Sequence, residues 1–111
     1  MKDDGIYLNH ILECIGRVEE YTKGGHEAFI ESTLIQDGVL RNLQTLGQSA
    51  TKISDALKTS HPEIDWKGIV GFRNVLVHDY LGINLARVWE VAANDLPDLK
   101  RKILVVLKKL E

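Results

Sequence analysis

The sequence predicts an all-α fold, an antiparallel bundle of about four or five helices joined by short loops. Apolar residues recur at three- and four-residue steps along most of the chain, which is the period of an amphipathic helix. Glycine, proline and capping residues separate these segments at intervals typical of helices. No stretch shows the sustained alternation of apolar and polar residues that a half-buried strand requires, so we expect no sheet.

The length and charge of the chain limit what the protein can be. Its 111 residues suffice for one hydrophobic core, so we expect residues 1–111 to form a single domain. The formal net charge of -2 argues against a broad phosphate-binding surface, and any contact with nucleic acid must be local. No apolar run approaches the ~20 residues of a membrane span or follows the charged start as a signal peptide would. We therefore expect a cytoplasmic protein without membrane contact.

Cysteine and histidine usage argues against a metal centre. Cys14 is the only cysteine, so no disulfide can form within the chain. It has no metal-ligating partners at a suitable spacing and is interpreted as a small buried hydrophobic residue. Three histidines, His10, His26 and His61, are also without such partners, and we expect them to be solvated. The sequence predicts no metal and no cofactor.

The first half of the chain predicts two main helices. Residues 5–22 carry apolar side chains at helical spacing, and Gly24–Gly25 is expected to end that helix. Thr33 and Gln36 have the spacing of a capping box at the start of the next helix. An unbroken apolar seam then predicts one long helix through Ile35, Val39, Leu43, Leu46, Ala50, Ile53 and Leu57. Within it, Gly47 costs about 1 kcal/mol relative to alanine, which is usually tolerated where another helix approaches closely.

The second half predicts a proline-bearing loop followed by three shorter helices. Asp65 is placed to cap a helix that runs to about Leu81, and Asn84 can cap the next one. Asp95 precedes Leu96–Pro97 at the expected start of the last helix, because proline is compatible with a first helical turn. The residues of this last helix that we expect to face inward are Leu99, Ile103, Val106, Leu107 and Leu110.

The residues able to do chemistry are concentrated in one helical stretch, residues 71–80. Arg73 supplies a permanent planar cation, His78 a group that titrates near neutrality, and Tyr80 a phenol. At about 100° per residue, these side chains and Asn74 share one side of the helix. Such a set suits phosphate recognition and proton transfer.

Ideal helix geometry predicts contacts within this stretch. Asn74 and His78 are four residues apart, so the amide can orient the imidazole and fix its tautomer. His78 lies in the last turn, where the helix dipole favours the protonated imidazole. Val75 and Leu76 fall on the opposite arc and are expected to pack into the core. Asp79 falls within that apolar arc, so we expect the regular helix to loosen there.

The stretch from Trp66 to Tyr80 resembles the R-x4-H-x-Y motif of HepT proteins, the toxin branch of the HEPN all-helical domains. The resemblance extends over nearly the whole chain. Residues 40–47 resemble the family's second-helix pattern, and residues 88–91 and 95–99 resemble its C-terminal half.

One departure from the family pattern lies directly after Gly47. The family often has a glutamate and an alanine there, whereas this chain has Gln48–Ser49. If that glutamate contributes a charge to the family's site or dimer, the contribution is missing here.

The resemblance implies a HEPN-like homodimer, the toxin of a type VII toxin–antitoxin system, in which the motif helices of two subunits face each other across a cleft. It implies a metal-independent endoribonuclease. We expect the RNA 2′-hydroxyl to attack the adjacent phosphate while His78 assists proton transfer and Arg73 stabilises the phosphate charge. Asn74 would support His78. The resemblance also implies an antitoxin, an MNT-type minimal nucleotidyltransferase that transfers AMP to Tyr80.

Two alternatives stay open at the level of the sequence. The first is a non-enzymatic helical module that binds a nucleotide or docks a minimal nucleotidyltransferase, since Arg73 and Tyr80 can hold an adenine nucleotide by charge and stacking. The second is a structural bundle without a site, in which Arg73 makes a surface ion pair and His78 only caps a helix.

Overall fold

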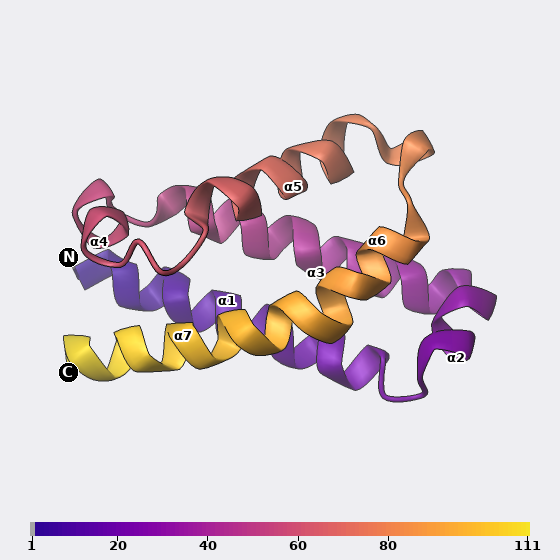
Figure 1. Ribbon diagram of the computed structural model, residues 1–111, viewed down its shortest axis with the longest axis horizontal. Coiled ribbons are helices and arrows are strands. Elements are labelled where there is room, and N and C mark those ends of the chain that lie inside the picture. The colour runs from indigo at the N-terminus through magenta and orange to yellow at the C-terminus, as the bar shows by residue number, and fades with distance from the viewer. Residues whose placement is uncertain (1) are drawn as a thin grey trace.

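Every regular element between residues 2 and 111 is helical, which confirms the all-α class (Figure 1). The computed structural model describes the backbone of residues 2–111 and the side chains of residues 3–79 and 81–111. In chain order the elements are α1 (Lys2–Tyr21), α2 (His26–Glu31), α3 (Thr33–Lys52), α4 (Asp55–Ser60), α5 (Trp66–His78), the 3-10 turn η1 (Tyr80–Gly82), α6 (Leu85–Glu90), the π-helical segment η2 (Val91–Asp95) and α7 (Leu96–Leu110).

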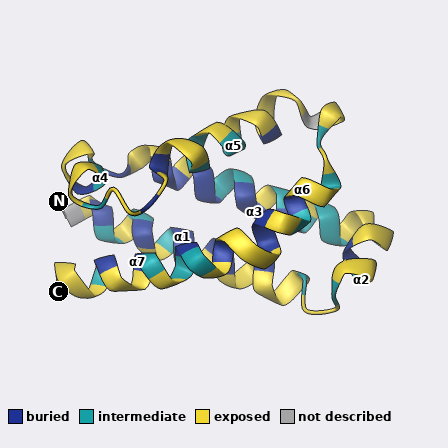
Figure 2. Cartoon of the chain, in the orientation of Figure 1, coloured by how far each residue is buried: buried dark blue, intermediate teal, exposed yellow. Residues whose placement is uncertain are grey.

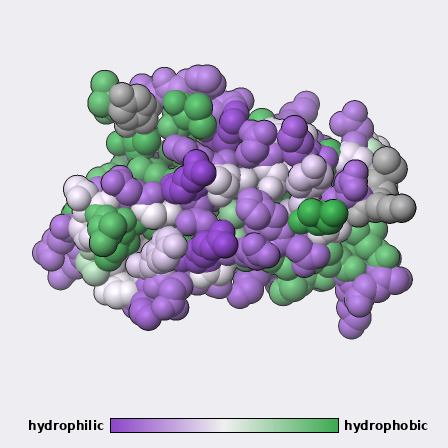
Figure 3. All heavy atoms as spheres, turned by 180° about the vertical axis from the view of Figure 1, so that it is seen from behind, coloured by the Kyte–Doolittle hydropathy of each residue, from purple (hydrophilic) through white to green (hydrophobic). Residues whose placement is uncertain are grey.

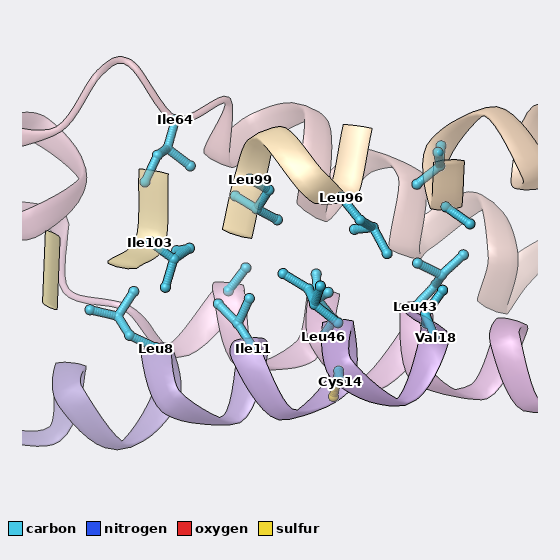
Figure 4. Close-up of a cluster of buried hydrophobic side chains, with 14 of the residues drawn as sticks. Leu8, Ile11, Cys14, Val18, Leu43, Leu46, Ile64, Leu96, Leu99 and Ile103 are labelled. Carbon is cyan, nitrogen blue, oxygen red and sulfur yellow. The ribbon is translucent and has the colours of Figure 1, made fainter. Parts of the chain in front are cut away.

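The four longest helices among these residues run antiparallel to their neighbours. Helix α1 packs along α3 on one side and along α7 on the other, and both chain ends lie at the same end of the bundle (Figure 1). Their apolar seams meet in one buried cluster, to which α1 contributes Leu8 and Ile11, α3 Leu46, and α7 Ile103 (Figure 4). The periodic apolar residues of the sequence therefore form the core, as periodicity predicts. None of the helices that the structure describes has the length and apolar character needed to cross a membrane.

Helix α5 lies on the outside of the bundle and packs chiefly against α3. The buried residues of α5 are Trp66 and Leu76, near the two ends of its apolar stripe. Much of the remaining helix surface is exposed (Figure 2). Val75 is 51% exposed, so the expectation that it packs into the core was wrong. A helix with one packed side leaves its other sides open for ligands or partners.

The long apolar seam does not form one helix. The helix breaks after Lys52, and Ser54 caps α4 by accepting a hydrogen bond from the Leu57 backbone N–H at 3.2 Å. The buried Asp4 carboxylate, from α1, accepts from the Ser54 backbone N–H at 2.8 Å and from its hydroxyl at 2.6 Å. These acceptors take the place of the backbone hydrogen bonds that a continuous helix would make here. Ile53 and Leu57 are still buried in the core.

Helix starts follow local capping rules, with one shift. Asp65 accepts a bond from the Gly68 N–H and Asn84 from the Arg87 N–H, as predicted. The cap of α3 is Ser32, which accepts from the Ile35 N–H at 3.1 Å, so the predicted capping box was placed one residue too late. The glycine turn after α1 is confirmed, because Gly25 has φ of 94°, a conformation that favours glycine.

The expected break before the last helix is absent from the described backbone. Asp95 has helical φ and ψ, and its side chain makes no capping bond. Instead α6 continues through η2 into α7, and the Leu96 N–H bonds the Val91 carbonyl, five residues back. Pro97 has no N–H to donate in this region, and a π-helical turn accommodates the changed bonding without ending the helix. At the far end of α7, Leu110 is 45% exposed rather than inward-facing.

Candidate active site

Helices α3 and α5 approach each other closely where Gly47 faces Arg73. A Cβ atom placed on Gly47 would lie 2.3 Å from the Arg73 Cβ and 2.6 Å from its Cγ, closer than real carbon contacts. The predicted reason for a glycine at this position, the close approach of another helix, is confirmed. The absence of a side chain at Gly47 therefore lets the stem of Arg73 lie directly on the backbone of α3.

The guanidinium of Arg73 is held between two neutral acceptors. Its Nη1 donates to the Asn74 Oδ1 at 2.9 Å, and its Nη2 donates to the Gln48 Oε1 at 2.8 Å. The Arg73 Nε is buried and has no hydrogen-bond partner among the described residues. No described carboxylate pairs with this guanidinium, so its charge is fixed in place and left unneutralised.

His78 is the last residue of α5, and its side chain is exposed. The helix ends there because Asp79 leaves the helical region, with φ of -133° and ψ of 46°, which confirms the predicted loosening. The predicted contact between Asn74 and His78 is not formed among the described side chains, since the Asn74 oxygen accepts from Arg73 instead. Helix spacing predicted only the contact between Asn74 and His78, but the charged guanidinium of the adjacent Arg73 donates to the amide oxygen.

The structure does not bring Arg73 and His78 into contact. Arg73 is half-buried and hydrogen-bonded to Gln48 of α3, whereas the His78 side chain is exposed to solvent at the end of α5. The backbone of Tyr80 begins η1, separated from α5 by Asp79, and its side chain lies outside the described residues. The described side chains of Arg73 and His78 therefore both stand on α5 without forming a closed site within this single chain.

Sequence reasoning missed a polar chain that links α1 to α3. The His10 Nδ1 lies 2.5 Å from the Ser49 Oγ, and the Cys14 Sγ lies 3.7 Å from the His10 Nε2 and 3.3 Å from the Thr45 Oγ1. His10 is therefore half-buried and bonded, and the expectation that it is solvated was wrong. The signal was present, because His10 and Cys14 are four apart on one helix, as are Thr45 and Ser49 on the other.

The other two histidines also have neighbours. The His26 ring contacts the edge of Trp89 at 5.2 Å between ring centroids, and the His61 Nδ1 lies 3.0 Å from the Glu63 Oε2. Cys14 is buried, as predicted, and its burial raises the pKa of the thiol. Among the described residues no group of three or more histidine, cysteine or carboxylate side chains is arranged to hold a metal ion.

A groove of about 530 Å³ lies beside α5, but the reactive side chains do not line it. Leu43 and Leu46 of α3 lie along it, with Phe72 of α5 and Leu99 of α7. Its lining is mostly apolar, whereas the free donors of Arg73 and the imidazole of His78 belong to other sides of α5. The predicted site residues Arg73 and His78 therefore lie outside this groove.

Comparison with known proteins gives a family match over most of the chain. Residues 11–106 match the family described as "Ribonuclease HepT-like". A Methanocaldococcus jannaschii protein named "Gamma-glutamylcyclotransferase and putative RNase" is 38% identical over 99% of this chain, and the chain spans 50% of that protein's length. A "Putative RNase" of the same organism is 32% identical over 95% of this chain and 97% of its own length.

A further relative carries the family name itself. A Thermococcus cleftensis protein named "Probable ribonuclease HepT" is 34% identical over 86% of this chain and 88% of its own length. No solved structure matches the chain significantly. The matched residues include all of α3 and α5, and therefore both Gly47 and the helix with Arg73 and His78. The chain belongs to the ribonuclease HepT-like family.

Proposed function

We propose that the protein is a metal-independent endoribonuclease whose catalytic residues are Arg73 and His78. One observation carries the proposal. The outer helix of a HepT-like chain holds an unneutralised guanidinium in a fixed direction and presents an exposed imidazole five residues later. An arginine fork suits a phosphate, and a histidine suits proton transfer near neutral pH.

The reaction requires no external nucleophile, because RNA carries its own. The 2′-hydroxyl oxygen attacks the adjacent phosphorus, and the 5′-oxygen of the next nucleotide leaves. The products are a 2′,3′-cyclic phosphate and a 5′-hydroxyl. His78 assists the proton transfer, and Arg73 stabilises the negative charge that grows on the phosphate oxygens. Asn74 keeps the guanidinium in position, which differs from the sequence-based expectation that it orients the imidazole.

The proposal includes a homodimer in which two copies of α5 face each other. Within one chain, Arg73 bonds Asn74 and Gln48 rather than His78. A second copy would bring an arginine of one subunit close to a histidine of the other. Apolar side chains are exposed along α5 and η1, where Val75 is 51%, Val77 37% and Leu81 89% accessible. Figure 3 shows green atoms gathered at this corner, at upper left. A facing copy would cover them and place two guanidinium groups in one cleft, which concentrates positive charge locally although each chain carries a net charge of -2.

Purified protein incubated with RNA in the presence of a chelator tests the activity. We expect cleavage products with cyclic-phosphate ends, and loss of cleavage in Arg73→Ala and His78→Ala. Expression of the wild-type chain alone should arrest growth, and either substitution should relieve the arrest. Retained toxicity in both variants would overturn the assignment. Tight binding of an adenine nucleotide without any RNA cleavage would instead favour a nucleotide-binding or docking subunit.

As part of the same proposal, the protein is the toxin of a type VII toxin–antitoxin pair and is silenced by AMP transfer to Tyr80. The backbone of Tyr80 begins η1, two residues after His78 at the end of α5. An AMP group there would add bulk and negative charge beside the groups that grip phosphate, so RNA would be excluded. Co-expression with an MNT-type nucleotidyltransferase should add at least one AMP mass to the peptide containing Tyr80. An inactive complex with unmodified Tyr80 would leave simple occlusion as the mechanism.

A further inference from the structure

We propose that the outer seam between α3 and α5 binds the phosphate backbone of single-stranded RNA. Three exposed cations form this surface, which we call the cation track: Arg41, Lys52 and Lys67. The inference rests on the proposed function, because the track flanks Arg73 and holds the nucleotides on both sides of the phosphate that is cleaved. It extends the site beyond α5, since two of the three cations belong to α3.

Charge is distributed unevenly over the chain. From residue 38 to the end of α3, and throughout α5, the chain has four lysine or arginine residues and no aspartate or glutamate. The remaining residues contain the other ten basic side chains and all sixteen acidic ones. The two helical stretches thus carry a formal charge of +4 and the remainder -6, which together give the net charge of -2. The candidate active site therefore lies in a local positive region, which attracts phosphates.

The guanidinium of Arg73 marks the outer seam of the two helices, because it bonds the exposed Gln48 of α3 at 2.8 Å and the exposed Asn74 of α5 at 2.9 Å. Arg41 lies two turns before Gln48 on α3, and Lys52 lies one turn after it. Residues at these spacings share one face of a helix. No described carboxylate forms an ion pair with either cation. The two cations of α3 therefore lie on the same side as the guanidinium.

Helix α5 carries a matching row on its side of the seam. Lys67 lies two turns before Asn74, and His78 lies one turn after it, so the three share one face of α5. Lys67 is exposed and also has no described carboxylate partner. At about 1.5 Å per residue, the row on α5 and the row on α3 are each about 16 Å long.

The two rows lie side by side in opposite order. The contact beneath the stem of Arg73 sets the register of the helices, which run antiparallel (Figure 1). Lys52 and Lys67 therefore lie at one end of the track, and Arg41 lies level with His78 at the other. Arg73 is between them, so a strand that follows the seam meets cations before and after the reacting phosphate. In the proposed dimer, α3 lies at the edge of the cleft because it flanks α5.

The length of the track and the reaction both favour a single strand. Domains that recognise double-stranded RNA contact about 16 base pairs across two minor grooves, which is far longer than this surface. Attack by the 2′-hydroxyl requires the 2′-oxygen, the phosphorus and the leaving 5′-oxygen to align. A regular A-form helix prevents this alignment, whereas a flexible strand permits it. The substrate is therefore single-stranded RNA that extends beyond the cleaved bond in both directions.

The test replaces each track residue with glutamine, which has a similar helix propensity and leaves the fold intact. Binding is measured in a His78→Ala background, with a single-stranded RNA whose 2′-hydroxyls are all methylated. We expect each substitution to weaken binding about 3-fold and the triple variant about 30-fold. Lys108→Gln is the matched control, because this exposed lysine of α7 also has no described ionic partner. It should leave the affinity unchanged.

Salt dependence separates phosphate contacts from a general effect of net charge. Each contact with a single strand contributes about -0.7 to the slope of log affinity against log salt concentration. The slope of the triple variant should therefore be shallower by about 2, and that of Lys108→Gln should not change. Equal effects of the control and the track substitutions would overturn the inference. Equal affinity for a duplex of the same sequence would overturn the preference for a single strand.

Substrate length provides a readout in the active enzyme. A dinucleotide has only the phosphate that is cleaved and cannot reach the ends of the track. In the triple variant we expect KM for a longer strand to rise about 30-fold, with kcat/KM for the dinucleotide unchanged. An equal loss with both substrates would mean that these residues support the fold or the reacting groups, and would overturn the track.

The outcomes distinguish this inference from the proposed function. Wild-type protein that binds single-stranded RNA through the three cations but cleaves none would refute the ribonuclease proposal and support the track. Unchanged RNA affinity in the triple variant would overturn the track even in an active enzyme. If that variant instead lost its association with an acidic protein, the positive region would be a protein interface.

Discussion

At the scale of single residues, Gly47 and Arg73 form one unit. The guanidinium reaches its acceptors only because the stem lies against a backbone without a side chain. Alanine at position 47 would place a methyl group 2.3 Å from the Arg73 Cβ, and the contact is with the stem rather than with a flexible tip. Either α5 moves outward or Arg73 changes rotamer, and both outcomes displace the cation.

We therefore expect Gly47→Ala to lower the free energy of unfolding by about 1–3 kcal/mol, as overpacking does, and to abolish RNA cleavage. Chemical denaturation and the cleavage assay measure the two effects. Gly16→Ala is the matched control, because a Cβ on this exposed helical glycine of α1 meets nothing within 4 Å. It should raise stability by roughly 0.5–1 kcal/mol. Similar stabilities for the two variants would contradict the close approach of α3 and α5.

Cys14 gives a residue-scale prediction about the core. Burial raises the pKa of its thiol, and the side chain has no exposed surface. The thiol therefore stays protonated and inaccessible at neutral pH, and only the thiolate reacts with alkylating reagents. We expect iodoacetamide to label Cys14 in the folded protein at a rate limited by unfolding, and quickly in denaturant. Fast labelling of the native protein, at the rate of the denatured chain, would show that α1 separates from α3 locally.

At the scale of elements, the corner between α3 and α4 depends on one buried carboxylate. Asp4, in α1, is 2% exposed, and its carboxylate accepts two hydrogen bonds from Ser54, which lies 50 residues later in the chain. Asp4→Ala leaves the Ser54 N–H and hydroxyl without this acceptor, and we expect a loss of about 1–3 kcal/mol in the free energy of unfolding. Asp3→Ala, at an exposed neighbouring position, should change stability little. Equal denaturation midpoints for the two variants would exclude the corner as a stabilising contact.

The elements also show which parts of the fold a sequence can predict. The apolar seams and the caps at Asp65 and Asn84 depend on neighbours a few residues away, and spacing alone identified them. The break at Ser54 depends on Asp4, fifty residues distant in the chain, so local rules favoured one continuous helix. The prediction of a helix break between η2 and α7 was wrong for a related reason. Pro97 permits both the start of a new helix and a widened helical turn, and packing decides between them.

The same distinction applies to the candidate site. Residue types and spacing predicted Arg73, Asn74 and His78 as one polar side of a helix, and their proposed roles await the assays described above. Spacing could not predict that Gln48 of α3 accepts from Arg73, because this contact depends on how two helices cross. The departure at Gln48–Ser49 was visible in the sequence, but its meaning required the neighbouring guanidinium and His10.

At the scale of the whole molecule, an acidic chain that acts on RNA must concentrate its cations. The net charge is -2, and a single chain presents Arg73 and His78 on one outer helix without contact between them. Two-fold symmetry would solve both problems, because an isologous interface through α5 brings two copies of each group together. Exposed Val75 and Leu81 would then be interface residues rather than apolar surface in water.

Mixing two inactive variants tests this arrangement. Neither Arg73→Ala nor His78→Ala should cleave RNA alone, but a mixed dimer holds one intact arginine and one intact histidine on opposite subunits. If the working pair is formed across the interface, exchange of subunits should restore about a quarter of wild-type activity, since half of the dimers are mixed and each has one complete pair. Light scattering establishes the dimer in the same samples. Activity that stays absent in a proven mixed dimer would place the working pair within one subunit, and a monomer at all concentrations would remove the interface altogether.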